Sequence, residues 1–162
     1  MRTILFVCTG NTCRSSMAAF MAQHFLAEAN MSDSVRILSA GTGAWPGAPA
    51  SEPAVLVMGE RGINLASHLS VPLTFDLVAE ADLILTMTRR HRQYIEEIWP
   101  QAADKTYTLA EYAGMEEEGP DVPDPFGCSM DDYRRCADRL WILVTAALEK
   151  YLGFEHNPTL QE

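Results

Sequence analysis

The sequence predicts an α/β protein in which helices cover both faces of a parallel β-sheet. Three observations lead to this fold class. Short apolar runs alternate with longer segments of helical periodicity along the 162 residues. The hydrophobic content of 48% is enough for one substantial core. No internal repeat or low-complexity segment divides the chain. Alternation of strands and helices within one domain is typical of a parallel sheet.

The first half of the chain supplies two of the expected strands. The apolar run at residues 3–7 predicts a buried strand, and residues 17–30 predict the helix that follows it. Residues 35–38 predict a second strand. A helix is expected around residues 51–61, because Pro53 lies in its first turn and Gly62 follows its last residue.

The second half repeats the alternation. Residues 83–87 and 106–109 predict strands, residues 89–99 and 131–151 predict helices, and residues 72–80 are compatible with a further short helix. We therefore expect one domain over residues 1–152. Residues 153–162 are expected to form a polar C-terminal tail.

Charge and cysteine content exclude several classes of protein. Twelve Lys and Arg against 22 Asp and Glu give a net charge of −10, which opposes binding to nucleic acid or to an anionic membrane. The start of the chain has no signal-peptide pattern and no apolar run is long enough to span a membrane, so we expect a cytoplasmic protein. The four cysteines form no CxxC pair, which argues against structural disulfides and a metal site.

The loop between the first strand and the first helix predicts an anion site. Backbone amides of such a loop and the helix N-terminus both attract a phosphate, and Arg14 has the reach to clamp it. Cys8 stands six residues before Arg14, at the base of the same loop, where those groups would stabilise a nucleophilic thiolate. Gly10 suits the turn. Ser15 is expected to cap the helix and to donate a hydrogen bond to Cys8.

Two later loops are expected to reach the same edge of the sheet. Ligands of open parallel sheets bind outside the carboxyl ends of the strands. The loop after the second strand carries Trp45, and a loop beyond the last strand carries Asp124 and Phe126. Pro123 and Pro125 restrict Asp124 to an extended backbone. We therefore expect a carboxylate and two aromatic rings near Cys8.

The residues and their order resemble the low-molecular-weight protein tyrosine phosphatase family over nearly the whole chain. The matching pieces are residues 6–15, 39–41, 62–63 with His68, 81–87 and 124–127. The resemblance implies a three-layer sandwich, with a four-stranded parallel sheet of order 2-1-3-4 between helices. It also implies a cysteine-dependent hydrolase that uses no metal and no cofactor, acts on phosphorylated proteins and releases inorganic phosphate.

The resemblance also assigns roles to residues. Cys8 is expected to attack phosphorus and form a phosphocysteine, Arg14 to hold the phosphate, and Asp124 to act first as general acid and then as base. Ser39 and His68 are expected to support the loop. The residues expected around the substrate are Thr9, Gly10, Asn11, Thr12, Cys13, Ser15, Trp45 and Phe126.

Thr12 bears on the choice of substrate. Family members that act on phosphotyrosine often carry Ile at this position, whereas Thr12, together with residues 124–127, resembles the bacterial protein arginine phosphatases. A threonine hydroxyl offers a polar partner to a guanidinium and less apolar surface to an aromatic ring. Phosphoarginine is therefore the first expectation and phosphotyrosine the alternative. An arsenate reductase is disfavoured, because there is no cysteine between Cys13 and Cys128, and a non-catalytic phosphate-binding module would not need Asp124.

The two loop cysteines leave one question open. Cys13 lies five residues after Cys8, so a reversible disulfide between them would shield the nucleophile from further oxidation. A small thiol that only packs the loop is an equal alternative.

Overall fold

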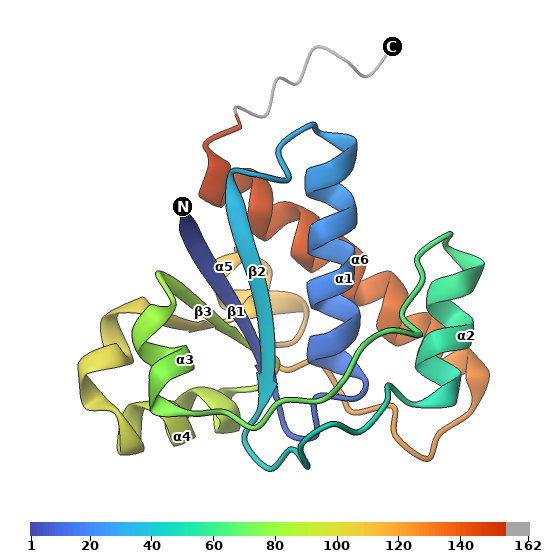
Figure 1. Ribbon diagram of the computed structural model, residues 1–162, viewed down its shortest axis with the longest axis horizontal. Coiled ribbons are helices and arrows are strands. Elements are labelled where there is room, and N and C mark those ends of the chain that lie inside the picture. Colours follow the sequence, from blue (N-terminus) through green and yellow to red (C-terminus); the bar gives the residue numbers. More distant parts are fainter. Residues whose placement is uncertain (155–162) are drawn as a thin grey trace.

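A computed structural model describes residues 1–154 and contains four strands between helices (Figure 1). In chain order the elements are β1 (Arg2–Cys8), α1 (Arg14–Glu28), β2 (Val35–Gly41), α2 (Glu52–Glu60), α3 (Phe75–Glu80), β3 (Leu83–Thr86), α4 (Arg89–Ile98), η1 (Pro100–Lys105), β4 (Thr106–Thr108), α5 (Leu109–Tyr112), η2 (Glu116–Glu118) and α6 (Met130–Leu152). The predicted alternation of strands and helices is confirmed.

The strands form one parallel sheet with the order β2-β1-β3-β4, as expected. The central strand β1 pairs with β2 along its whole length, from Arg2 opposite Val35 to Cys8 opposite Gly41. Figure 1 shows the carboxyl ends of β1 and β2 at one edge of the molecule, where several long loops meet. This edge is where a parallel sheet offers a ligand site.

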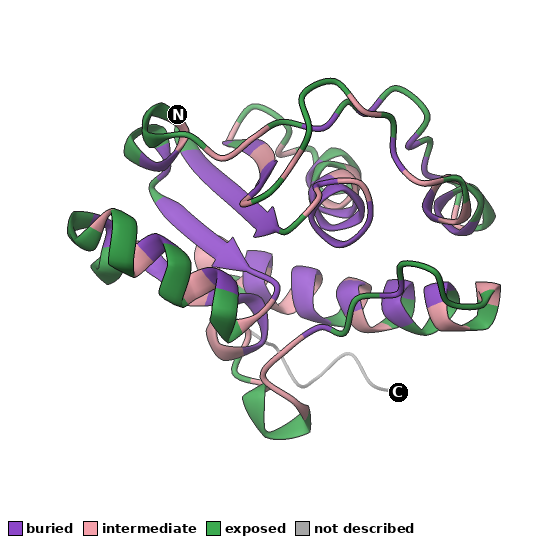
Figure 2. Ribbon diagram, turned by 90° about the horizontal axis from the view of Figure 1, so that it is seen from below, coloured by how far each residue is buried: buried purple, intermediate pink, exposed green. Residues whose placement is uncertain are grey.

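The two faces of β1 belong to different parts of the core. Ile4 and Phe6 pack with the buried sides of α1, α2 and α6. Leu5 and Val7 pack with α3, α4 and η1 on the opposite face. All four side chains are fully buried, which explains why β1 is a continuous apolar run. Figure 2 shows the resulting three layers, with buried strands between helices whose outward faces are exposed.

Two predicted boundaries change in ways that affect the site. Strand β2 continues to Gly41, so Ser39 lies inside the strand, opposite Phe6. Helix α1 begins at Arg14, which puts Ser15 in its first turn. The expectation that Ser15 caps α1 is therefore wrong: the N-cap residue is Cys13, and no side chain caps this helix. The short elements η1, α5 and η2 were not predicted, because three to six residues are too few to show a helical period.

Helix α2 begins and ends where proline and glycine predicted. Ser51 is its N-cap residue and a proline lies in its first turn. Gly62 follows the helix with a φ of +76°, a left-handed conformation that glycine adopts without strain. Within residues 1–154, no helix combines the length and apolar character that a membrane span requires. Of the predicted C-terminal tail, residues 155–162 lie outside the described part of the chain.

Candidate active site

A cavity of about 240 Å³ opens at the carboxyl end of β1. The loop between β1 and α1, called the phosphate loop (residues 8–14) below, forms most of its wall. A second loop, called the acid loop (residues 121–127), closes the opposite side. The residues that line the cavity are Cys8, Thr9, Gly10, Asn11, Thr12, Cys13, Arg14, Asp124 and Phe126.

The sulfur of Cys8 accepts hydrogen bonds at the base of this cavity. The thiol is buried, with its Sγ 2.9 Å from Ser15 Oγ and 3.3 Å from the backbone nitrogen of Asn11. Asn11 Nδ2 donates to Ser15 Oγ at 2.8 Å, so the serine hydroxyl donates its own proton, and the Cys8 sulfur at 2.9 Å is a nearer acceptor than the carbonyl oxygen of Ala40 at 3.5 Å. Donors directed at sulfur stabilise negative charge on it. Ser15 therefore serves the thiol rather than the helix end.

Asn11 holds the phosphate loop in a conformation that side chains rarely adopt. Its φ is +57°, in the left-handed region. Its Nδ2 also donates to Ser39 Oγ at 2.9 Å, and its Oδ1 accepts from the backbone nitrogen of Val71 at 2.9 Å. His68 Nε2 lies 2.6 Å from the carbonyl oxygen of Asn11, and burial lowers the pKa of this histidine. The neutral ring donates this bond. Four partners from three segments thus compensate for the strained backbone.

A further histidine, not predicted as part of the site, contacts the phosphate loop. His91 in α4 is buried, and its Nε2 lies 2.8 Å from Thr9 Oγ1. The backbone nitrogen of Thr88 donates to His91 Nδ1 at 3.2 Å, so the ring proton is on Nε2 and is donated to Thr9. Burial, and after it the charge of Arg14, lowers the pKa of His91 to about 4. The ring is therefore neutral at pH 7.

Nothing in the spacing of the histidines singles out His91. It lies in the basic run at residues 89–92, and a run of charged residues at the start of a helix is typical of a solvated surface. The available signal was local: Thr88 and His91 have the spacing of a capping box, and both reciprocal hydrogen bonds are present.

Gly41 brings the end of β2 against the phosphate loop. A Cβ atom at this position would lie 2.3 Å from the carbonyl oxygen of Thr9 and 3.0 Å from the nitrogen of Asn11. No side chain fits there. The amide of Gly43 also donates to the carbonyl of Thr9, at 3.0 Å. The end of β2 therefore holds the loop through these backbone contacts as well as through the hydrogen bond from Asn11 to Ser39.

Arg14 and Asp124 face each other across the cavity. Arg14 is only 5% exposed, and its Nη1 donates to the carbonyl of Val122 at 3.2 Å. Its Nη2 lies 3.6 Å from Asp124 Oδ2, while the other carboxylate oxygen accepts from the backbone nitrogen of Phe126 at 3.1 Å. About half of the Asp124 side chain is exposed. A buried cation and an accessible carboxylate therefore share one cavity with the Cys8 thiol.

The other expected substrate-binding residues separate into two groups. Thr12 and Phe126 line the cavity, and Phe126 is 71% exposed at its mouth. Trp45 is not among the lining residues, and it is 81% exposed. The position of Trp45 in the loop after β2 had suggested that its ring lies near Cys8. Because the ring is exposed, burial of hydrophobic surface does not hold it there.

The sulfur of Cys13 lies near three hydroxyl groups, of which Thr12 Oγ1 is the most distant at 3.9 Å. Its Sγ lies 3.1 Å from Ser51 Oγ and 3.5 Å from the hydroxyl of Tyr133. Burial raises the pKa of Tyr133 to about 12, so the phenol is neutral at pH 7. All four cysteines are free thiols. A disulfide between Cys8 and Cys13 stays a prediction. Among residues 1–154, no group of three or more His, Cys, Asp or Glu side chains is arranged to hold a metal ion.

A buried thiol that accepts hydrogen bonds, an arginine beside it and a carboxylate across the cavity define a cysteine-dependent phosphatase. The chain belongs to the low molecular weight phosphotyrosine protein phosphatase family, whose model matches residues 3–153.

Individual relatives carry two kinds of name. A protein-arginine-phosphatase of Bacillus subtilis is 42% identical over 85% of this chain and 88% of its own. A low molecular weight protein-tyrosine-phosphatase of Acinetobacter johnsonii is 35% identical over 77% of this chain and 80% of its own. Among solved structures, the arginine phosphatase YwlE superposes with a TM-score of 0.85 and 39% identity, covering 95% of this chain and 97% of the other. That structure is a cysteine-to-serine mutant with a phosphorylated active-site serine.

Proposed function

We propose that this phosphatase hydrolyses phosphoarginine in proteins through a phosphocysteine intermediate. The observation that carries the choice of substrate is Thr12, whose side chain lies in the wall of the catalytic cavity. Its hydroxyl is a hydrogen-bond partner for a guanidinium N–H, which an isoleucine would not be. Relatives named protein-arginine-phosphatase support the same substrate, at 42% and 41% identity.

The first step of the proposed reaction transfers the phosphoryl group to Cys8. Its thiolate attacks phosphorus, a P–S bond forms, and the bond from phosphorus to the guanidine nitrogen breaks. Asp124 supplies the proton that the leaving nitrogen takes up. Arg14 balances the charge on the phosphoryl oxygens, for which its place beside the cavity is suitable.

The second step regenerates the enzyme. Asp124, now ionised, takes a proton from water, and the water oxygen attacks phosphorus as the P–S bond breaks. Inorganic phosphate leaves and Cys8 is again a thiolate. Ser15 and Asn11 stabilise that thiolate, because both contact the Cys8 sulfur.

Phosphotyrosine is the second candidate, because the exposed ring of Phe126 at the mouth of the cavity offers a surface for an aromatic substrate. Under either substrate, we propose a cytoplasmic enzyme whose partners are phosphorylated proteins. Nucleic acid and membranes are not among its proposed partners.

Two substitutions at Thr12 distinguish the candidates. Thr12→Val keeps the branched shape and removes the hydroxyl, so hydrolysis of a phosphoarginine-containing protein should fall about 10- to 150-fold, the cost of a hydrogen bond to a charged group. Thr12→Ile adds apolar reach, and the ratio of phosphotyrosine to phosphoarginine turnover should rise. The measurement is kcat/KM for both substrates with each variant. Faster turnover of a phosphotyrosine peptide by the unmodified enzyme would overturn the first choice.

A further inference from the structure

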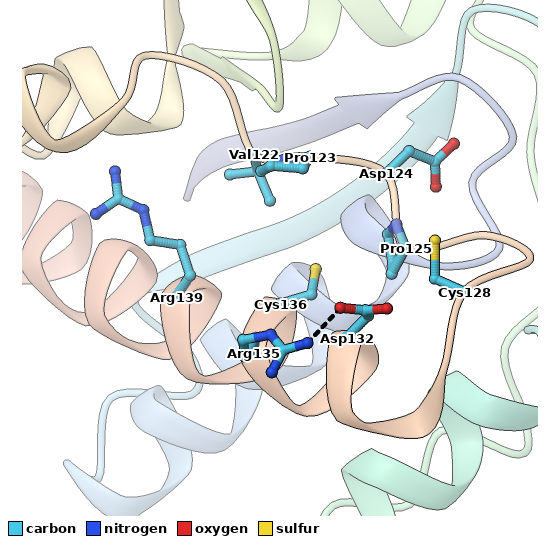
Figure 3. A pocket seen from close by; sticks show the side chains of 9 residues that line it. All are labelled: Val122, Pro123, Asp124, Pro125, Cys128, Asp132, Arg135, Cys136 and Arg139. Carbon is cyan, nitrogen blue, oxygen red and sulfur yellow. Dashed lines mark hydrogen bonds and ion pairs between the residues drawn. The ribbon is translucent and has the colours of Figure 1, made fainter.

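A second cavity lies behind the acid loop, between that loop and the first half of α6 (Figure 3). Its volume is about 340 Å³, against about 240 Å³ for the catalytic cavity. The two cavities share Asp124 as a wall residue. The residues that line the second cavity are Val122, Pro123, Asp124, Pro125, Cys128, Asp132, Arg135, Cys136 and Arg139.

The floor and roof of this cavity are apolar and uncharged. Val122 and the rings of Pro123 and Pro125 come from the acid loop, and Cys136 comes from α6. Cys136 is 8% exposed. Burial raises the pKa of its thiol to about 12, so it stays neutral at pH 7.

The charged groups around this cavity already have partners. Arg135 donates to Asp132 at 2.5 Å. Arg139 donates to Glu118 at 2.9 Å and to the carbonyl of Gly119 at 3.0 Å. Figure 3 shows the carboxylate of Asp124 pointing away from this cavity. A charged ligand would compete with these ion pairs, whereas a neutral ligand would leave them as they are.

We propose that this second cavity binds a neutral aromatic molecule of one or two rings, and that the bound molecule holds the acid loop in its present position. Its volume is at the small end of the range for ligand cavities, about 300–1,000 Å³. Proline rings, cysteine sulfur and the face of a guanidinium all pack well against aromatic rings, and this cavity is lined by each of them.

The link to activity follows from how the acid loop is attached. At its start, the amide of Val122 donates to the carbonyl of Met87 at 2.8 Å. Just after its end, the backbone amide of Cys128 donates to the carbonyl of Pro125 at 2.9 Å. Between these points, Asp124 faces the catalytic cavity and the prolines face the second one. A molecule packed under the prolines restricts the loop, which raises the fraction of time that Asp124 is in place for proton transfer. This step rests on the proposed role of Asp124.

Indole, a neutral two-ring aromatic, is a suitable probe. In an NMR titration the methyl signals of Val122 should shift in a saturable manner. With p-nitrophenyl phosphate as a general substrate, saturating indole should raise kcat about twofold and leave KM unchanged. The absence of saturable shifts would overturn the site. A rise in KM, or competition with inorganic phosphate, would place indole in the catalytic cavity and overturn it equally.

Variants at the second cavity sharpen the test. Cys136→Leu fills the floor and should weaken indole binding at least tenfold. Cys128→Trp, at an exposed position that does not depend on core packing, places an indole ring at the mouth and should also exclude the free probe. Ile142→Ala is a matched control on an exposed part of α6 and should bind indole as the unmodified protein does.

The binding site and its link to the acid loop can be contradicted separately. Equal binding by the unmodified protein and both cavity variants would overturn the site, whatever the activity. Binding with an unchanged or lower kcat would overturn the link to the acid loop. Neither result depends on the choice between phosphoarginine and phosphotyrosine, because binding is read by NMR and the rate by a general substrate.

Discussion

At the scale of single residues, His91 is a neutral group that donates its proton to the phosphate loop. Its pKa of about 4 lies below the ordinary value of 6.5, so at intermediate pH the unfolded chain binds a proton that the folded chain does not. The stabilisation linked to His91 is therefore complete above pH 6.5 and is lost as the pH falls toward 4. His68, whose pKa burial also lowers, adds to the same trend.

We therefore expect the melting temperature to fall on acidification, and to fall less steeply in His91→Gln. Glutamine is neutral at every pH and keeps an N–H donor for Thr9, so it removes the titration while leaving the contact available. Thermal unfolding of the unmodified protein and of His91→Gln, measured from pH 7 to pH 4.5, gives the slope of melting temperature against pH for each. Part of the slope should survive in the variant because of His68. Identical slopes in the two proteins would show that His91 does not supply the linkage.

The exposed carboxylate of Asp124 gives a second expectation for a single residue. Asp124→Asn keeps the size and the hydrogen bond to Phe126 but cannot donate or take up the reacting proton. If Asp124 is the acid, kcat should fall about 10²- to 10⁴-fold on a substrate with a poor leaving group. Inorganic phosphate should still bind, since Arg14 and the phosphate loop are unchanged. Full activity of Asp124→Asn would assign the proton transfer to another group.

How much the sequence predicts depends on how local the cause is. Cys8 and Arg14 lie in one short loop, so their spacing alone brings them together. Asp124 is distant, but it follows the last strand of a parallel sheet and is fixed between prolines. The contact between His91 and Thr9 joins residues 82 positions apart, and only packing of α4 brings it about. Trp45 shows another limit: its ring is exposed and does not line the cavity, so packing does not fix its position, and its contact with the substrate stays a prediction.

At the scale of elements, the end of β2 shapes the phosphate loop. The apolar pattern stops at Leu38, which is why the strand was predicted too short. Pairing with β1 extends it to Gly41, since backbone hydrogen bonds do not require apolar side chains. The consequence is functional, because the extension brings Gly41 to the carbonyl of Thr9 and Ser39 to Asn11.

Gly41→Ala should damage both stability and catalysis. Its Cβ would lie 2.3 Å from a backbone oxygen, so the strand end or the phosphate loop must move. We expect a loss of about 1–3 kcal/mol in the free energy of unfolding, typical of overpacking. We also expect a large loss of kcat, since Thr9 is adjacent to Cys8. Gly43→Ala is the matched control: its nearest neighbour is Thr9 Cγ2 at 3.7 Å, an ordinary contact. The measurements are the free energy of unfolding in denaturant and kcat, each for both variants. Equal losses in Gly41→Ala and Gly43→Ala would contradict the steric argument.

At the scale of the whole molecule, the catalytic cavity is a junction of elements that are distant in the chain. The phosphate loop joins β1 to α1, contacts β2 through Gly41 and α4 through His91, and faces the acid loop through Arg14. The strand order that creates this junction follows from the resemblance to a known family, not from periodicity, because an alternating pattern fixes the elements but not their neighbours. A ligand bound in the cavity therefore lies where several elements of the fold meet.

Inorganic phosphate should accordingly stabilise the entire fold. A ligand that binds only the folded chain, at a hundred times its dissociation constant, adds about 2.7 kcal/mol, which for a chain of this size raises the melting temperature by roughly 5–11 °C. Because the net charge is −10, added salt also has an effect, and sodium chloride at equal ionic strength is the control.

Cys8→Ser should keep the shift caused by phosphate, since serine preserves the loop. Arg14→Lys should lose much of it, because an ammonium group cannot bind two phosphate oxygens in the manner of a guanidinium. The quantity to compare is the shift within each variant, not its absolute melting temperature, since Arg14 is buried and its replacement also weakens the fold. An undiminished shift in Arg14→Lys would mean that phosphate binds away from this cavity.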